Sequence, residues 1–334
     1  MNQKQIFTCL IHEDTSPQVE ILRVLRMIDK KEAEKILESS KTLDWYHKFE
    51  VELGSSVFTP GRLDTKGYQW RRDFVGLSEE TLSGKRVLDI GAYSGAFSFL
   101  LQDLGADVVA LDVYDPDFNG FNLVKKLRQR ELEHHVMSIY DIDKDILGEF
   151  DIVACYGVHY HLRHPILAFE RCNSVCKEGG LFIGGGTGMD RWFHDDEDHC
   201  ASGVNFDALE KSIVANTDIL SVENVGELPL CGFSPTHFLR DKTNWFIPNL
   251  TCLLSWAEAC GFEVQKSHKH SAPVIRDWNQ DERVHRTSLN FVSRKISVPP
   301  QEYTWKRMKQ YRIPTQVEVD RLVARIEELE KQVS

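Results

Sequence analysis

The sequence lacks an excess of positive charge: 40 Lys and Arg stand against 51 Asp and Glu, which gives a formal net charge of −11. This balance offers no broadly basic surface for a phosphate backbone, so nucleic acid (tRNA included) is disfavoured as the partner. The chain also lacks any run of about 18 apolar residues that would span a membrane. The short apolar stretch at residues 6–11 is followed by no cleavage-like site. We therefore expect a cytoplasmic protein with no membrane contact.

The eight cysteines include no C-x-x-C pair, which gives no support for a zinc or redox motif. Several lie inside apolar patterns, as Cys155 and Cys252 do, and we expect reduced, mostly buried thiols. Two histidines, His194 and His199, lie among carboxylates in residues 190–200. Ligands of a metal must converge in space, and a contiguous stretch does not ensure this, so we expect a solvated acidic loop and no metal.

Residues 84–99 predict a strand, a tight turn and a helix. A short apolar run, 87–90, contains Asp89 and ends at Gly91, and an apolar helical pattern starts directly after Gly95. Glycines at the carboxyl end of a strand allow a sharp turn and a close approach to a ligand. The third glycine of the dinucleotide pattern is missing, and no Gly-Lys-Ser/Thr follows, so the turn is no phosphate loop.

The next apolar run, residues 108–111, ends in Asp112, about twenty residues after the glycine turn. A carboxylate in this place accepts hydrogen bonds from both ribose hydroxyls of an adenosine. An ordinary dinucleotide fold with Asp112 on the ribose of NAD is the alternative. The two runs resemble motif I and the following strand of the class I S-adenosylmethionine (SAM)-dependent methyltransferases. That resemblance implies SAM as cofactor, in contact with seven residues: Asp89, Gly91, Tyr93, Gly95, Asp112, Asp141 and Tyr156.

Strand and helix patterns alternate along the chain, with further strands expected around residues 135–140, 150–155, 181–183, 262–264 and 288–292. The expected fold class is α/β, a Rossmann-like, seven-stranded, mostly parallel sheet with helices on both faces. We place a helical cap at residues 1–44, an aromatic lid segment at 45–80 and the methyltransferase domain at 81–298. An insertion follows the fifth strand at about 189–248, beyond the glycine run 184–188, and a C-terminal tail occupies 299–334.

The turn after the fourth strand, residues 157–165, is expected to face the methyl acceptor, because ligands of such sheets bind at the carboxyl ends of the strands. It contains His159, Tyr160 and His161. Histidine titrates near neutral pH, so this turn supplies candidate bases, with His161 first. The alternative is that these side chains only hold the loop by hydrogen bonds to the backbone.

Aromatic residues and turn formers are concentrated in residues 45–70. A segment of this kind just before the first strand of the domain either folds over the ligand and excludes water, or packs on the sheet. Tyr68 and Trp70 are the candidate acceptor contacts within it.

A longer set of motifs is similar to one branch, the tRNA wobble-uridine carboxymethyltransferases. The matching stretches are residues 64–65, 70–71, 84–91, 157–165, 244–248 and 261–262. The resemblance implies a carboxylated SAM held by a lysine, a tyrosine and an arginine, of which Tyr160 and Arg286 match. Lys48 does not fit the spacing of the lysine, and Ala92-Tyr93 replace the usual Cys-Gly. We therefore expect ordinary SAM, with Trp245 and Arg286 among the acceptor contacts.

The expected activity is in-line transfer of a methyl group from SAM to an oxygen or nitrogen of a small-molecule or sugar-type acceptor. The alternatives are a tRNA wobble-uridine (carboxy)methyltransferase, which would use carboxy-SAM, and a SAM-binding protein without turnover. The tail has apolar residues at heptad spacing over residues 319–333. A helix this short either pairs with a second copy, giving a homodimer, or docks on its own domain.

Overall fold

The computed structural model describes residues 29–52, 54–64, 66–188, 229–233, 243–277 and 282–296, with backbone alone at 66, 271–277 and 282–286. Four predicted parts lie wholly or mostly outside these residues: the first 28 residues of the expected cap, most of the expected insertion, the His194–His199 loop and the C-terminal tail. No helix in the described part of the chain is long and apolar enough to cross a membrane.

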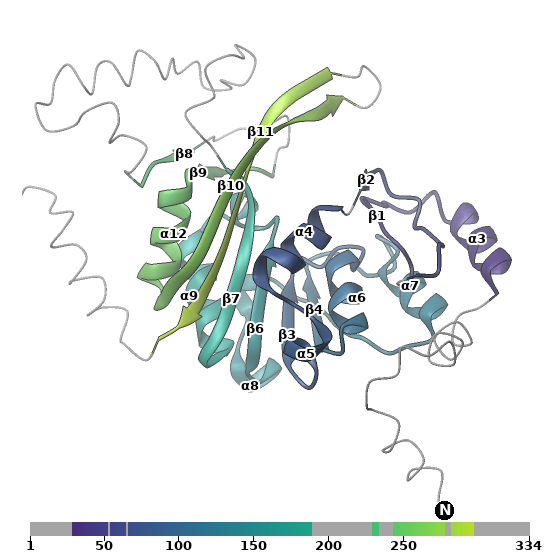
Figure 1. The fold of residues 1–334 in the computed structure, drawn as a ribbon, viewed down its shortest axis with the longest axis horizontal. Coiled ribbons are helices and arrows are strands. Elements are labelled where there is room, and N and C mark those ends of the chain that lie inside the picture. The colour runs from purple at the N-terminus through teal and green to yellow at the C-terminus, as the bar shows by residue number, and fades with distance from the viewer. Residues whose placement is uncertain are drawn as a thin grey trace, which may run out of the picture.

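A seven-stranded sheet organises the fold, in the order β10-β11-β7-β6-β3-β4-β5 (Figure 1). β11 is antiparallel to both of its neighbours, whereas the pairs from β7 to β5 are parallel. The α/β, Rossmann-like, mostly parallel sheet predicted from the sequence is therefore confirmed. The strands are β3 (Arg86–Ile90), β4 (Asp107–Asp112), β5 (Glu133–Val136), β6 (Phe150–Tyr156), β7 (Cys176–Gly188), β10 (Phe262–Asp277) and β11 (Glu282–Lys295).

Helices cover both faces of this sheet because the strands bury side chains on both sides (Figure 1). Val87 of β3 packs in one apolar cluster and its neighbour Leu88 packs in the other. The first cluster includes α6 (Ala96–Asp103) and α7 (Phe121–Arg128), and the second includes α9 (Pro165–Val175) and α12 (Leu250–Ala259). Two short helices, α5 (Glu79–Leu82) and α8 (Lys144–Leu147), precede β3 and β6.

The segment before the sheet packs on the α6 and α7 side. It contains α3 (Lys30–Ser39), the parallel strands β1 (His47–Lys48) and β2 (Leu63–Asp64), and α4 (Lys66–Val75). Asp29 caps the start of α3, because its side chain accepts from the N–H groups of Lys31 and Glu32. Trp45 is buried, and its ring fills the space beside Gly120, where a Cβ would lie 2.3 Å from it. Phe49 stacks on Phe99 of α6.

Two predictions of strand position were wrong. The third strand was expected around residues 135–140, but β5 ends at Val136 and a 3-10 turn, η1 (Ile139–Asp141), follows. The Ser138 side chain caps that turn by accepting from the Tyr140 N–H at 3.3 Å, which favours the turn over a longer strand. The glycine run was expected beyond the fifth strand, but it lies within β7. A Cβ at Gly185 would lie 2.0 Å from the Leu289 carbonyl oxygen of β11, so the close pairing of these strands requires glycine there.

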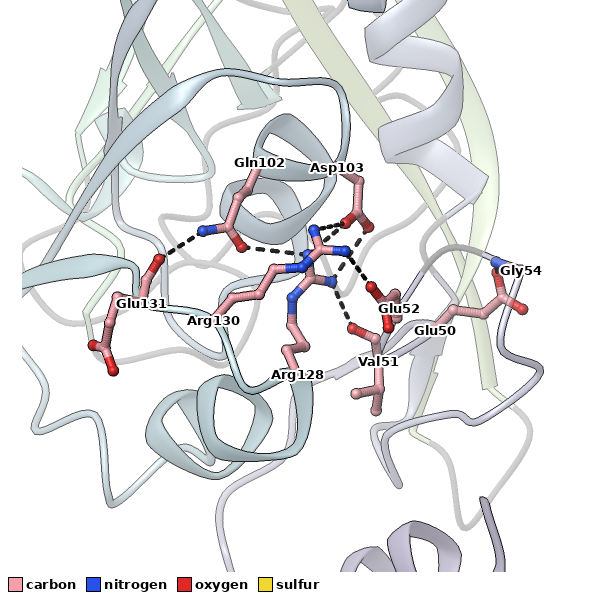
Figure 2. A network of polar contacts seen from close by, with 9 residues as sticks. All are labelled: Glu50, Val51, Glu52, Gly54, Gln102, Asp103, Arg128, Arg130 and Glu131. Atoms are coloured by element: carbon pink, nitrogen blue, oxygen red, sulfur yellow. Dashed lines mark hydrogen bonds and ion pairs between the residues drawn. The ribbon is translucent and has the colours of Figure 1, made fainter. Parts of the chain in front are cut away.

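A buried ionic network fastens the N-terminal segment to the sheet domain (Figure 2). The Arg128 side chain is fully buried; it donates to the Val51 carbonyl at 2.7 Å and pairs with Asp103 at 2.5 Å. Arg130 pairs with the same Asp103 at 3.0 Å and with Glu52. Removing a charge from water costs free energy, and these ion pairs and hydrogen bonds offset that cost for the buried Arg128 guanidinium. Residues 51–52 are thus held in place from α6 and from the end of α7.

Candidate active site

The predicted glycine turn lies at the carboxyl end of β3. Gly91 has φ 75° and Gly95 has φ 84°, both in the left-handed region that other residues avoid. The Gly91 N–H donates to the Leu111 carbonyl at 2.8 Å, which joins the turn to the end of β4. A Cβ at Gly91 would lie 2.4 Å from the Val158 side chain, and so the turn between β6 and η2 (His159–His161) packs directly on this glycine.

Asp112 ends β4 and is 5% exposed. Its two carboxylate oxygens accept from the backbone N–H groups of Tyr93 at 2.8 Å and Tyr114 at 3.0 Å. Burial raises the pKa of this carboxyl, while the N–H donors act in the opposite direction. Asp112 is therefore fixed beside the glycine turn, where the sequence predicted it.

Asp89 is buried within β3 and accepts from the Ser98 hydroxyl of α6 at 2.5 Å. Burial raises the pKa of Asp89 to about 7 against the stabilising effect of that hydrogen bond. The carboxyl thus fixes the first turn of α6 under the glycine turn. It titrates close to neutral pH.

Two further predicted cofactor contacts lie at the rim. Tyr93 has φ 47°, and its hydroxyl donates to Asp44 at 2.5 Å, so it bridges the glycine turn to the N-terminal segment. Its ring meets Tyr114 edge-on, with centroids 5.6 Å apart. Asp141 is exposed and belongs to η1, just past the end of β5. Both residues follow the carboxyl ends of strands, Tyr93 after β3 and Asp141 after β5, as Asp112 stands at the carboxyl end of β4.

The three candidate catalytic residues together form η2, directly after β6. His159 is 1% exposed, and its Nε2 donates to the Thr187 carbonyl at 2.9 Å. The His161 Nδ1 lies 2.8 Å from the Thr243 hydroxyl. Tyr160 stands between them, 5.1 Å from the ring of His159 and 4.3 Å from that of His161, centroid to centroid. His159 therefore anchors the turn, and His161 is the more accessible imidazole.

Trp245 reaches η2 from the far side of the expected insertion. Its backbone N–H donates to the Tyr160 carbonyl at 2.8 Å, and the Arg163 guanidinium lies 4.3 Å from its ring centroid. It directly precedes β9 (Phe246–Pro248), which pairs with β8 (Cys231–Phe233). Trp245 thus lies against the candidate catalytic turn, and its role as an acceptor contact stays a prediction.

An aromatic wall adjoins the glycine turn. Two of its rings, His47 and Tyr68, come from the N-terminal segment, while Phe97 belongs to α6 and Tyr156 ends β6. Tyr68 stacks on Phe97 at 5.5 Å, and Phe97 meets Tyr156 edge-on at 5.4 Å. The Tyr68 hydroxyl lies 3.1 Å from His47 Nε2. Burial and the nearby Arg71 lower the pKa of His47 to about 3, so this imidazole is neutral. The Tyr156 hydroxyl is buried and has no hydrogen-bond partner among the residues that the structure describes.

Arg71 of α4 is the site residue to which the sequence gave no role. Its guanidinium lies over two rings of the wall, 4.9 Å from the Tyr68 centroid and 4.7 Å from that of Tyr156. Among the described residues no carboxylate lies within ion-pair distance of it. The only signal in the sequence was its place in the Trp70-Arg71 motif. A half-buried cation of this kind, oriented by two tyrosines, is suited to an anionic ligand group.

Two predicted acceptor contacts, Trp70 and Arg286, have no described side-chain contact with this wall. Trp70 is 40% exposed and stacks on Phe74, with His268 of β10 at 5.1 Å, so it packs between α4 and the edge strand. Arg286 lies on β11, where its backbone pairs with Ala272, and its side chain lies outside the described atoms. No metal-binding cluster of His, Cys, Asp and Glu occurs within the described residues.

Residues 63–197 match the family described as "Methyltransferase domain". The matched region contains the glycine turn, Asp112 and η2. This part of the chain is thus similar to a methyltransferase domain, as its motifs predicted. The N-terminal domain of EvdMO1 with S-adenosylhomocysteine (SAH) bound has the same fold, with a TM-score of 0.51 and 16% sequence identity over 81% of this chain and 98% of that one.

Named relatives align with parts of this chain. A ubiquinone biosynthesis O-methyltransferase of Xanthomonas campestris pv. campestris (strain B100) is 34% identical over 120 residues, which are 34% of this chain and 47% of that protein. A tRNA U34 carboxymethyltransferase of Geobacter sp. (strain M21) is 26% identical over 213 residues, 63% of this chain and 53% of that one. The chain thus spans about half the length of each relative.

The residues of this site fit SAM, the cofactor that the motifs predicted. Asp112 offers carboxylate oxygens that suit ribose hydroxyls, and Gly91 and Gly95 leave room for close approach to the backbone. The buried Tyr156 hydroxyl and the Arg71 guanidinium, which pairs with no carboxylate of the described residues, suit the polar amino-acid end of the cofactor. NAD, the alternative that the carboxylate alone left open, has no support from these comparisons.

Proposed function

We propose that the protein transfers the methyl group of SAM to an oxygen or nitrogen of a small-molecule or sugar-type acceptor. The observation that carries this proposal is the composition of the aromatic wall and of η2, which both adjoin the glycine turn. Aromatic rings and histidines make up most of these two elements, and the Arg71 guanidinium lies over the rings of Tyr68 and Tyr156. Apolar rings surrounding a few placed polar groups are typical of small-ligand sites.

The residues divide the work by position. Asp112 binds the ribose hydroxyls, and Arg71 binds the carboxylate of the cofactor's methionine part. SAM, when bound, supplies a methyl group on a sulfonium that is a good leaving group. The protein then has to align the acceptor and exclude water, and Tyr68, Phe97 and Tyr156 supply the apolar surface for this. For a hydroxyl acceptor, His161 accepts the proton while Thr243 fixes its ring.

The second candidate is a wobble-uridine (carboxy)methyltransferase acting on tRNA. The length of the alignment favours it, because the Geobacter carboxymethyltransferase aligns over 63% of this chain and the Xanthomonas O-methyltransferase over 34%. Tyr160 also keeps the place of the tyrosine that the resemblance assigns to carboxy-SAM. This function requires tRNA binding that weakens steeply with salt.

The deciding experiment incubates the full chain with SAM carrying a labelled methyl group. Two acceptor fractions are offered, small molecules including nucleotide sugars, and total tRNA. The proposal expects label in a small-molecule product and none in tRNA. Label in tRNA would replace it with the second candidate, and native mass spectrometry of the purified protein separates SAM from carboxy-SAM by mass. A protein that binds SAH and forms no product with either fraction would be the binding protein without turnover.

A further inference from the structure

Two cysteines distant in sequence meet beside β9. Cys231 opens β8, opposite Pro248 of β9, and Cys252 lies in the first turn of α12. The Asn249 side-chain oxygen accepts from the N–H of Leu230 at 3.2 Å and from that of Cys252 at 2.9 Å, so one amide fixes both backbones. The Asn249 N–H in turn donates to the Leu230 carbonyl at 2.9 Å.

The two thiols lie close enough to interact with each other, and the Cys231 thiol also donates to the Gly232 carbonyl at 3.5 Å. The interaction between the two thiols lowers the pKa of Cys231 and raises that of Cys252. Both thiols are free. Their positions also differ, since Cys231 is exposed and Cys252 is 5% exposed. The more acidic thiol is therefore the one that meets solvent, and thiolate character and exposure are what govern thiol reactivity.

The remaining described cysteines provide the contrast. Cys155, Cys172, Cys176 and Cys260 are buried, and burial raises the pKa of Cys172, Cys176 and Cys260. A buried thiol of raised pKa is inert toward oxidants. Among the described cysteines, Cys231 thus combines exposure with a lowered pKa, and Cys252 is in contact with it to resolve an oxidised sulfur.

We propose that Cys231 and Cys252 are a redox modification site that forms a reversible intramolecular disulfide when the protein meets a peroxide. The Cys231 thiolate attacks one peroxide oxygen, the O–O bond breaks, and Cys231 becomes a sulfenic acid while hydroxide leaves and takes up a proton. The Cys252 sulfur then attacks the Cys231 sulfur, the S–O bond breaks, and a second water leaves. Two thiols and one hydrogen peroxide give one disulfide and two waters.

The bridge would join β8 to α12 across the segment that leads to the candidate active site. Trp245, one residue before β9, donates its N–H to Tyr160 of η2. A covalent link at Cys231 and Cys252 removes the freedom of β8 to separate from α12. The site is independent of which acceptor the methyltransferase uses, because its formation needs only the two sulfurs and the oxidant.

The test treats the folded, reduced full chain with one equivalent of hydrogen peroxide, alkylates the remaining thiols and digests the protein. The expected result is a peptide pair linked through Cys231 and Cys252, lighter by two hydrogens and released by a thiol reductant. In the denatured protein, the thiol count falls from eight to six. Alkylation of both residues after peroxide, or a bridge from Cys231 to Cys200 or Cys9, would overturn the proposal.

Two variants sharpen this result. Cys252→Ser removes the resolving thiol, so Cys231 is expected to accumulate as sulfenic acid that dimedone traps. Cys176→Ser removes a buried thiol, and the Cys231–Cys252 bridge is expected to form as in the wild type. A Cys252→Ser protein in which dimedone labels another cysteine faster than Cys231 would also contradict the assignment. The wild-type peptide map decides the matter if either variant fails to fold.

Discussion

The Asp112 carboxylate accepts a hydrogen bond from the Tyr93 N–H at 2.8 Å, although the two residues belong to different strand-turn units. The bond joins the acid at the end of β4 to the glycine turn at the end of β3. If the proposed function holds, an adenosine whose ribose binds Asp112 lies against the turn without further adjustment. Asp112 and the turn are held together before any ligand binds.

Asp112→Ala should weaken SAH binding on the order of 10- to 100-fold, because hydrogen bonds to a charged group contribute roughly 1.5–3 kcal/mol. Isothermal titration calorimetry with SAH measures this. Asp107→Ala is the matched control, since Asp107 lies at the opposite end of the same strand and is exposed. Equal affinities for the two variants would remove Asp112 from the cofactor site.

Arg71→Met should weaken binding of SAH and leave binding of 5′-methylthioadenosine nearly unchanged. Methylthioadenosine keeps the adenosine and the sulfur but lacks the amino-acid part, so the loss isolates the carboxylate contact. The expected loss for SAH is about tenfold or more, as for one charge-assisted hydrogen bond. Arg72→Met is the control, because Arg72 pairs with Asp73 instead. A parallel loss for both ligands would show that Arg71 supports the wall and binds no carboxylate.

Asp89 should make the protein less stable as pH rises. Burial raises its pKa from 3.8 to about 7, so between these values the folded state binds a proton that the unfolded state has released. The stability that this proton contributes is complete below about pH 4 and is lost as pH rises through 7. Asp89→Asn cannot ionise. The difference between its free energy of unfolding and that of the wild type, both measured with urea, should therefore shift in favour of the variant from pH 5 to 7 and stay constant above that.

A second carboxyl provides the control for this pH profile. Burial alone would raise the pKa of Asp151, but hydrogen bonds from Lys177 and from the Arg86 N–H lower it below 3.8. The stability that Asp151 contributes is therefore lost only at pH values below about 4. Asp151→Asn should differ from the wild type by a constant amount between pH 5 and 8. A constant difference for Asp89→Asn over the same interval would contradict the raised pKa.

Arg128→Met should lower the free energy of unfolding by about 3 kcal/mol, because it leaves Asp103 buried beside one cation instead of two and the Val51 carbonyl without its donor. Urea unfolding followed by circular dichroism measures the change. Lys126→Ala, in the same helix but exposed, should change it by less than about 0.5 kcal/mol. A loss no larger than that of the control would mean that the network contributes little.

The local features of the domain were predictable from the sequence, and the long-range ones were not. Gly91, Gly95 and Asp112 follow apolar runs at fixed spacing, and strand and helix periods locate such units directly. The true end of β5 was missed because Ser138 competes for the backbone through its own side chain. The glycines of β7 were misplaced because the pattern does not reveal the close approach of β11.

The site was predicted in its strand-end parts and missed where distant segments meet. Arg71 is a candidate site residue because its guanidinium lies over the Tyr156 ring, and no spacing rule connects a residue of α4 with the end of β6. The three residues of η2 were grouped correctly, but the different surroundings of His159 and His161 come from Thr187 and Thr243, which are remote in sequence. Tertiary contacts of this kind are set by packing, which the one-dimensional pattern does not encode.

The buried Arg128 also bears on how such a protein changes during evolution. The match to the methyltransferase family begins at residue 63, yet the partners of Arg128 and Arg130 include Val51 and Glu52, which precede that boundary. A recombination event that exchanged only the matched region would leave two guanidinium groups without those partners. An exchange of this region that keeps the network therefore has to include residues 51–52, and a substitution at Glu52 would leave Arg130 with Asp103 as its remaining ion-pair partner among the described residues.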